Sequence, residues 1–207
     1  DCPESRGLGD VYKRQYIRFA FVKTPYWDKI DDDSKVNLEN FISNLIELKV
    51  NVEEIDLNNL ILESSEIHKK ISGFEFKRSI SAERFHHYNE LSDILRNGRL
   101  SDGENMSLSD YHYLFDQLEK HKNIFYNKIS SYDCIISPSA LGEAQSGLEY
   151  TGSPVLNTTW TLLGLPSITL PMFKSKNNLP IGCQFISKKA DDNKLLSISK
   201  KILLEFS

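Results

Sequence analysis

Long hydrophobic runs are missing from this 207-residue sequence. Its apolar stretches, such as residues 168–170 and 202–204, are far shorter than the roughly 20 residues that cross a bilayer. A basic stripe is missing as well: 25 Lys and Arg are scattered among 29 Asp and Glu, and the net charge is -4. Binding to phosphate backbones requires clustered positive charge. These absences argue against a membrane-spanning protein and against direct binding of nucleic acid.

Cysteine is also scarce. The three cysteines, Cys2, Cys134 and Cys183, show no paired spacing of the kind that marks a disulfide framework or a zinc site. The last two lie in apolar, strand-like runs, where a buried reduced thiol is the more common state. This use of cysteine favours a cytoplasmic protein.

The start of the chain has neither an initiating methionine nor the basic, apolar and small-residue regions of a signal peptide. Its segment Asp-Val-Tyr-Lys-Arg-Gln at 10–15 resembles a translation of the transposon end that is used in preparing sequencing libraries. On that resemblance, residues 1–15 are an adaptor-derived artefact. The natural sequence would then begin near Tyr16, in mid-gene.

The first third of the chain predicts an α/β unit. Residues 16–22 have the β-branched and aromatic content of a strand, and residues 51–57 form a second, weaker candidate. Between them, Asp31 can cap a helix whose apolar residues recur at helical spacing. Strand, helix and strand in this order favour a right-handed parallel crossover within an α/β sheet.

Helices dominate the middle of the sequence. A long helical stretch is expected over 59–98, with a break near 81–86, and the glycine and serine residues of 97–107 predict a loop. Ser107 and Asp110 have the spacing of a capping box, which predicts that another helix begins there.

The last third returns to strands. Residues 132–138 predict a strand that ends at a proline, and residues 139–155 form a long Gly-, Ser- and Ala-rich loop, which in a compact domain is more often functional than not. A serine and a proline then predict a helix over 155–163 that ends at Gly164. The remaining expected elements are a hairpin of strands at 167–170 and 181–186 and a final helix capped by Asp191 and Asp192.

Two motifs in this last third resemble a known family. Gly-Leu-Pro-Ser-Ile-Thr-Leu-Pro at 164–171 is followed by Leu-Pro-Ile-Gly-Cys-Gln-Phe-Ile at 179–186 and then by Asp192. Their order and spacing resemble the C-terminal signature of the amidase-signature family, and residues 132–160 are similar to bacterial members. The resemblance covers residues 16–207 and implies an α/β fold with a mixed β-sheet flanked by helices. These residues would be the C-terminal portion of a single amidase domain.

The resemblance also implies an activity: hydrolysis of a small-molecule amide by a Ser-Ser-Lys triad that needs no cofactor. Family members carry the triad in a Gly- and Ser-rich segment of their N-terminal half. In this chain the only Ser-Ser pairs, at 64–65 and 130–131, have no flanking glycines and fall in helical or helix-end contexts. No catalytic residue is carried over, and we expect the fragment alone to be inactive. A homodimer of the intact parent protein is left open.

The candidate substrate-binding residues are Ser137, Asn157 and Trp160, because family members build part of their substrate site from this region. The alternative is that Trp160 is a core aromatic residue and that Asn157 makes only local hydrogen bonds.

Other polar residues have simpler expected roles. No cysteine or carboxylate falls at a ligand spacing from the five histidines, so surface histidines and no metal site are expected. Glu75 and Arg78 are three residues apart on an expected helix, where they can form an ion pair. A substrate role for these two residues is the alternative.

Three functions remain open. The first is a small-molecule amidase, and the second is the glutaminase (A) subunit of a tRNA-dependent amidotransferase. That subunit carries a glutamine-binding aspartate about ten residues before the glycine of the Gly-Leu-Pro motif, where this chain has Pro154. The third is a non-catalytic α/β interaction module.

Overall fold

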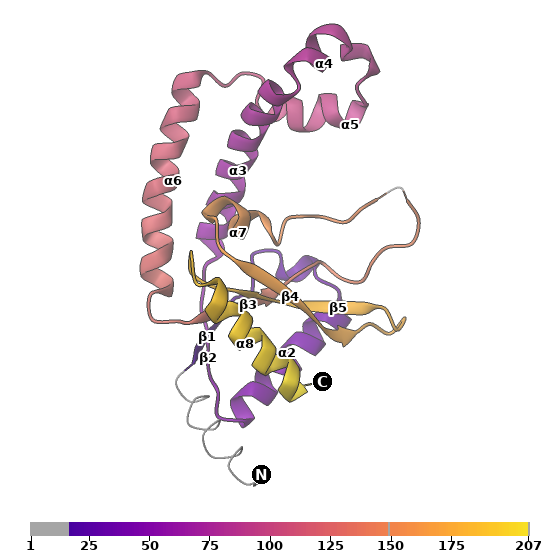
Figure 1. The fold of residues 1–207 in the computed structure, drawn as a ribbon. Coiled ribbons are helices and arrows are strands. Elements are labelled where there is room, and N and C mark those ends of the chain that lie inside the picture. Colours follow the sequence, from indigo (N-terminus) through magenta and orange to yellow (C-terminus); the bar gives the residue numbers. More distant parts are fainter. Residues whose placement is uncertain (1–16, 149, 207) are drawn as a thin grey trace. The chain divides into compact units, whose positions relative to one another are not determined.

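The computed structural model describes residues 17–148 and 150–206, which form two compact units (Figure 1). Unit 2 is the segment Leu60–Asn127, and unit 1 combines the described residues before and after it in sequence. The segment 1–15, expected to derive from an adaptor, lies outside the described residues.

Unit 1 begins with the expected strand, helix and strand. These are β1 (Arg18–Phe21), α2 (Asp32–Glu47) and β2 (Asn51–Glu54). Asp31 caps α2, since its Oδ1 accepts a hydrogen bond of 2.7 Å from the amide of Ser34. Strands β1 and β2 pair in parallel, which confirms the predicted parallel connection.

The rest of unit 1 extends this pair into a mixed sheet. Strand β3 (Cys134–Pro138) pairs in parallel with β1, and the hairpin of β4 (Ser167–Lys174) and β5 (Pro180–Ile186) adds antiparallel pairs, with β5 against β3. Within the described residues the order is β2-β1-β3-β5-β4. The predicted α/β class with a mixed sheet and a C-terminal hairpin is therefore confirmed. Two further helical elements of unit 1 are η2 (Trp27–Lys29) and α8 (Asp192–Phe206).

One face of this sheet carries the main apolar core of unit 1. Helices α2 and α8 both contribute to it, and Phe41 of α2 joins them. The Phe41 ring centroid lies 6.3 Å from that of Phe185 on β5 and 5.0 Å from that of Phe206 at the end of α8, both in edge-on geometry. The buried members of this core are Phe19, Phe21, Leu38, Phe41, Ile42, Leu45, Cys134, Ile136, Leu170, Cys183, Phe185, Leu195, Ile198 and Ile202.

The opposite face of the sheet is apolar at one end and polar at the other. Because side chains alternate along a strand, Ile135 and Ser137 of β3 share this face, and their partners on β5 are Ile186 and Gln184. All four side chains are buried. The polar pair lies at the carboxyl end of β3, the end of a parallel strand at which α/β proteins commonly place their ligands.

The helix α7 (Thr158–Leu163) is shorter than predicted, because the expected helix over 155–163 begins three residues late. The residues before it form a turn in which the amide of Asn157 donates to the carbonyl of Pro154 at 2.9 Å. The end is as predicted: Gly164 has φ 65° and ψ 39°, the left-handed conformation that terminates helices.

Unit 2 is helical, and the predicted break near 81–86 is confirmed. Helix α3 (Asn58–Ser79) ends there and α4 (Ser81–His86) begins. The following elements are η3 (Tyr88–Glu90), α5 (Asp93–Leu95), η4 (Arg96–Leu100) and α6 (Leu108–Ile129). Within the described residues, no helix combines the length and the apolar composition that crossing a membrane requires.

The capping box at the start of α6 is confirmed. The amide of Asp110 donates to Ser107 Oγ at 3.1 Å, and the amide of Ser107 donates to Asp110 Oδ2 at 2.9 Å. The expected loop over 97–107 is wrong in its first part, where residues 96–102 form helical turns with a kink at Gly98, whose φ of -101° and ψ of -107° are not helical. Ser101 supports these turns, because its hydroxyl donates to carbonyls three and four residues earlier.

Candidate functional site

Ser137 and Gln184 are the two buried polar residues at the polar end of the sheet. They are direct partners across the β3–β5 pair, and their side chains are 0% and 3% exposed. Ser137 Oγ and Gln184 Oε1 are buried oxygens without a hydrogen-bond partner among the described residues. Buried polar atoms are nearly always paired, so two adjacent unpaired oxygens mark an unusual position. Ser137 was predicted from the sequence, whereas Gln184 was not.

Asn157 lies beside this pair. Its Nδ2 donates to the carbonyl of Ser139 at 3.2 Å, and its Oδ1 accepts from Gln184 Nε2 at 2.7 Å. Asn157 therefore joins β5, the segment after β3 and the start of α7, three segments that are far apart in sequence. The structure brings the predicted residues Ser137 and Asn157 together, with Gln184 between them.

The segment after β3 packs unusually close to β5. Ser139 Oγ donates to the carbonyl of Gly182 at 2.9 Å. A Cβ atom at Gly182 would lie 2.7 Å from Ser139 Oγ and 2.4 Å from Thr169 Cγ2, well inside van der Waals contact. Only glycine leaves room for this approach.

Trp160 is 2% exposed and lies in the middle of α7. It is one of the largest buried side chains. Its neighbour Thr159 is also buried, and Thr159 Oγ1 has no hydrogen-bond partner among the described residues. This burial agrees with a core role for Trp160, and the predicted substrate role stays a prediction.

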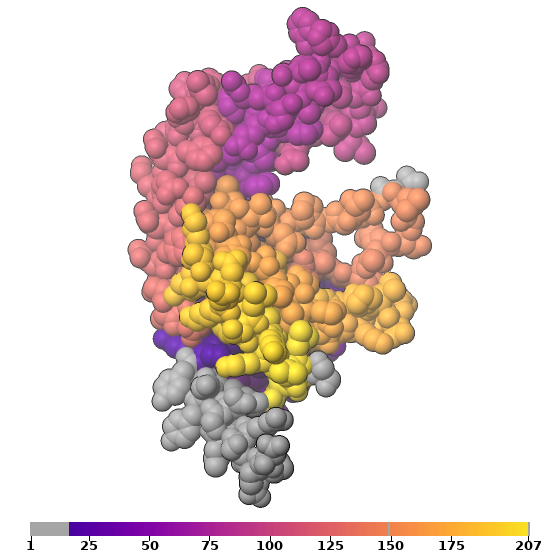
Figure 2. Space-filling model, viewed as in Figure 1, coloured from indigo at the N-terminus to yellow at the C-terminus, as the bar shows by residue number. Residues whose placement is uncertain are grey.

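The long loop after Ser139 is fixed at its beginning and projects from the rest of unit 1 further along, where it is orange in Figure 2. Glu143 is the main anchor: its carboxylate accepts hydrogen bonds from the hydroxyl of Ser175 and, at 2.6 Å, from Asn177 Nδ2. The N-cap residue Asp31 accepts from the amide of Glu143 at 3.2 Å and donates its own amide to the carbonyl of Leu141 at 2.8 Å. The loop is thereby tied to α2 and to the β4–β5 turn.

The chemistry available at this site is that of hydrogen bonding and shape. Its side chains are hydroxyls, carboxamides and an indole, none of which is a strong base. Within the described residues, no group of three His, Cys, Asp or Glu side chains could hold a metal ion.

Comparison with known proteins now identifies the family. The family model described as amidase matches residues 9–196 of the chain. The chain belongs to the amidase family. It is 26% identical over 212 aligned residues to the A subunit of glutamyl-tRNA(Gln) amidotransferase from Staphylococcus aureus, and the match covers 88% of this chain. The chain spans only 44% of the length of that relative.

Solved structures agree on the fold of this amidase-family chain. A crystal structure of an amidase matches with a TM-score of 0.74 and 19% identity, and covers 92% of this chain and 46% of its own. A fatty acid amide hydrolase matches with a TM-score of 0.72 and 16% identity, over 92% of this chain and 40% of its own. At these identities the likeness shows the amidase fold alone.

The resemblance described above implies serine chemistry, so the environment of the Ser-Ser pairs matters. Ser64 is 0% exposed, and its Oγ lies 2.8 Å from His121 Nε2. His121 Nδ1 in turn lies 3.3 Å from Glu63 Oε2. The order of groups is that of a serine-histidine-acid triad, but a buried hydroxyl cannot reach a substrate carbonyl. The network instead links α3 to α6, and the prediction of surface histidines is wrong for His121, which is 4% exposed.

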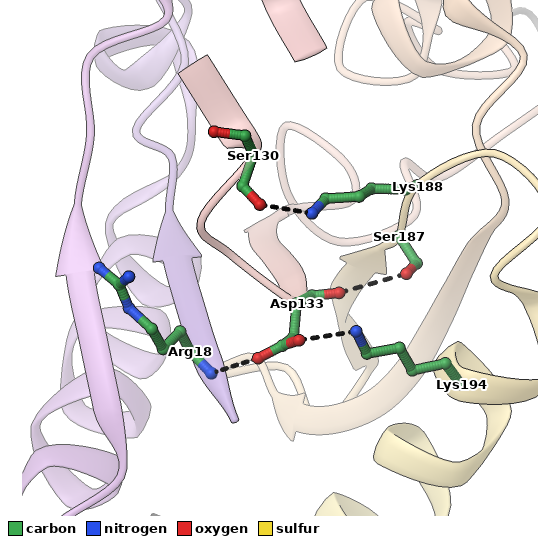
Figure 3. A network of polar contacts seen from close by, with 6 residues as sticks. All are labelled: Arg18, Ser130, Asp133, Ser187, Lys188 and Lys194. Carbon is green, nitrogen blue, oxygen red and sulfur yellow. Dashed lines mark hydrogen bonds and ion pairs between the residues drawn. The ribbon is translucent and has the colours of Figure 1, made fainter. Parts of the chain in front are cut away.

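The other pair, at 130–131, borders a polar network at the opposite end of the sheet from the site (Figure 3). Asp133 is its centre: Oδ2 accepts from the amide of Arg18 at 2.8 Å, and Oδ1 accepts from Lys194 Nζ at 2.6 Å. Lys188 Nζ donates to the carbonyl of Ser130 at 2.7 Å. Partial burial raises the pKa of Asp133, but the hydrogen bonds from Arg18 and Lys194 outweigh it, so the net pKa lies below its ordinary value. This network holds β1, β3 and α8 of the amidase fold together.

The two described cysteines are structural parts of the same sheet. Burial raises the pKa of the Cys134 thiol to about 12 and that of Cys183 well above its ordinary range. Both thiols are free and buried, as the sequence predicted.

Proposed function

We propose that the intact protein to which this chain belongs hydrolyses the amide bond of a small molecule, with a Ser-Ser-Lys triad that lies outside this chain. The observation that carries the proposal is the match of the amidase family model to residues 9–196. Within this chain, the polar end of the sheet lies at the carboxyl end of β3, beside a long anchored loop, which is a suitable place for the wall of a substrate pocket.

In this proposal Ser137, Asn157 and Trp160 form the acyl side of the substrate pocket. Asn157 holds Gln184 and the backbone of Ser139 in place through its two hydrogen bonds. The unpaired oxygens of Ser137 and Gln184 are acceptors that an amide N–H group could satisfy. Trp160 supplies a rigid aromatic side chain from α7 to the pocket wall.

The test of the pocket residues needs the intact protein. Replacing Asn157 by Ala should raise KM for the amide substrate about tenfold, while the matched control Asn44→Ala, at an exposed position of α2, should leave it unchanged. Steady-state kinetics and a thermal unfolding curve of each variant would be measured. An equal KM for wild type and Asn157→Ala would remove this residue from the pocket.

We also propose that residues 16–207 alone hydrolyse no amide, because their Ser-Ser pairs lack the glycine-flanked context of the triad. The purified chain would be incubated with simple aromatic and aliphatic amides, and the release of ammonia would be followed. Turnover that a point change within this chain abolishes would show that the chain carries its own nucleophile.

A second candidate function is the glutaminase subunit of a tRNA-dependent amidotransferase, because relatives from Staphylococcus aureus carry the name of such a subunit. Against it stands Pro154, at the place where that subunit is expected to hold glutamine with an aspartate. The intact protein would be assayed with glutamine and with aromatic amides. Preference for glutamine would favour the amidotransferase, and preference for aromatic amides would favour the amidase.

A non-catalytic α/β interaction module is the third hypothesis. An intact protein that carries the glycine-flanked Ser-Ser pair and hydrolyses an amide would exclude it.

A further inference from the structure

A hollow in unit 2 combines positive charge with an apolar floor. It has a volume of about 450 Å³ and lies where the end of α3, the start of α4 and the segment before α6 meet. Its lining residues are Phe74, Lys77, Arg78, Ser81, Arg84, Met106 and Leu108. A second hollow adjoins it and shares three of these residues, Phe74, Arg78 and Leu108.

The three cations at this hollow form no ion pair within the part of the chain that the structure describes. Lys77 Nζ donates to the carbonyl of Glu104 at 2.6 Å, and an Arg84 amino group donates to the carbonyl of Lys77 at 3.2 Å. Among the described residues, no carboxylate lies within 4 Å of the charged groups of Lys77, Arg78 or Arg84. The ion pairs of unit 2 are made by other cations, namely Lys69, His87, Arg96, His121 and Lys122.

Glu75 lines the adjoining hollow together with Arg78 but forms no ion pair with it among the described residues. Glu75 and Arg78 were expected to form an ion pair, but Glu75 Oε1 instead accepts a hydrogen bond of 2.7 Å from the hydroxyl of Tyr111. This hydrogen bond raises the pKa of Tyr111. The guanidinium of Arg78 lies over the ring of Phe74, 5.3 Å from its centroid, and Arg78 is an exposed residue of the lining.

The floor of the hollow is aromatic and rigid. Phe74 is 6% exposed and stacks on Tyr111 with ring centroids 4.6 Å apart. Met106 and Leu108 add adaptable and branched apolar surface. A volume of this size falls within the range of about 300 to 1,000 Å³ that is typical of small-molecule sites, which combine an apolar lining with a few polar groups.

We propose that this hollow binds a small organic anion, in which a carboxylate or phosphate group is carried on an apolar body. The anionic head would lie among Lys77, Arg78 and Arg84, and the apolar body would rest on Phe74, Met106 and Leu108. Positive residues in the last turns of α3 and α4 also stabilise their helix dipoles. That role requires neither the convergence of three cations on one hollow nor an apolar floor beneath them.

Binding to the full chain would be measured by calorimetry and by amide chemical shifts, with benzoate and phenyl phosphate as the two anionic probes. Acetophenone, a neutral molecule with a similar body, is the matched control ligand. We expect saturable binding of at least one anion with shift changes at residues 74–84 and 106–108, and at least tenfold weaker binding of acetophenone. The stronger anion identifies the preferred head group.

The variants Arg78→Gln and Arg84→Gln should each weaken anion binding about tenfold. Lys120→Gln removes the same charge from an exposed position of α6 outside the hollow, and should change the affinity less than twofold. The proposal is overturned if neither anion binds at 10 mM, if acetophenone binds as tightly as the anions, or if the three variants behave alike. Because the readout is binding within unit 2, these outcomes do not depend on amide hydrolysis.

Discussion

The close approach of Ser139 to β5 allows a sharp test at Gly182. In the variant Gly182→Ala the new Cβ would lie 2.4 Å from Thr169 Cγ2 and 2.7 Å from Ser139 Oγ, whereas such atoms normally stay about 3.5 to 4.0 Å apart. Overpacking of this kind costs about 1 to 3 kcal/mol. Moving Ser139 away would also weaken its hydrogen bond to the Gly182 carbonyl, a loss of about 0.5 to 1.5 kcal/mol.

One effect opposes this loss. Alanine restricts the unfolded chain more than glycine does, which returns about 0.4 to 1 kcal/mol. The expected net change for Gly182→Ala is therefore a destabilisation of about 1 to 3 kcal/mol. Urea unfolding followed by tryptophan fluorescence measures this change in the unit that contains Gly182, because both tryptophans of the sequence, Trp27 and Trp160, lie in unit 1.

A variant background that lacks both clashing atoms separates the steric clash of Gly182→Ala from other effects of the substitution. Ser139→Ala removes the hydroxyl and Thr169→Ser removes Cγ2, so in the double variant the new methyl group at position 182 meets neither atom. In that background Gly182→Ala should cost less than about 0.5 kcal/mol, which corresponds to a coupling of at least about 0.5 kcal/mol. An equal cost of the substitution in both backgrounds would refute the steric account, and with it the described position of Ser139.

Three further predictions concern the buried polar groups and thiols. Because the folded pKa of Asp133 is lowered, its contribution to stability is present above its unfolded pKa of about 3.9 and is lost as the pH falls through the folded value. Asp133→Asn should therefore reduce the free energy of unfolding by about 1 to 3 kcal/mol at pH 7 and by progressively less below about pH 4, as urea unfolding can measure. Ser64→Ala leaves His121 Nε2 without its hydrogen-bond partner and should cost about 1 to 3 kcal/mol in thermal unfolding. A fluorophosphonate probe should not label the buried Ser64 of the native chain, and labelling would contradict its structural role. Cys134 and Cys183 should resist iodoacetamide at pH 8 until the chain is denatured, as peptide mass spectrometry can check, and rapid native alkylation would contradict their burial.

The features that could be predicted from the sequence depend on contacts between residues close in the chain. The N-cap at Asp31, the capping box at Ser107 and the helix end at Gly164 each involve at most a few residues, so their side chains and spacing are sufficient evidence. The parallel connection between β1 and β2 could also be predicted, because a strand, a helix and a strand in this order can be joined in only a few topologies.

The features that were missed depend on contacts between distant residues. The burial of His121 follows from its place opposite Ser64 on another helix, and no local pattern reports that contact. Gln184 acquires its position from its pairing with Ser137 and its hydrogen bond to Asn157. A signal for it was present, since a glutamine inside the apolar run Cys-Gln-Phe-Ile must find polar partners when buried.

The late start of α7 has a similar cause. Ser153 and Pro154 have the residue types of a helix beginning, but the amide of Asn157 bonds to the Pro154 carbonyl in a turn, and the side chain of Asn157 is drawn to Ser139 and Gln184. Tertiary hydrogen bonds here override a local preference.

Unit 1 is interrupted in sequence by unit 2, and this has a consequence for synthesis on the ribosome. Strands β1 and β2 emerge first, but β3, the second partner of β1, follows only after the approximately 70 residues of unit 2. At about 5 to 20 residues per second, the edge of β1 waits some 3 to 14 seconds for its partner. During that interval Phe19 and Phe21, both buried in the finished sheet, lack the part of their core that β3, β5 and α8 supply. The order of the strands thus makes the nascent chain a candidate client for chaperones that bind exposed apolar segments.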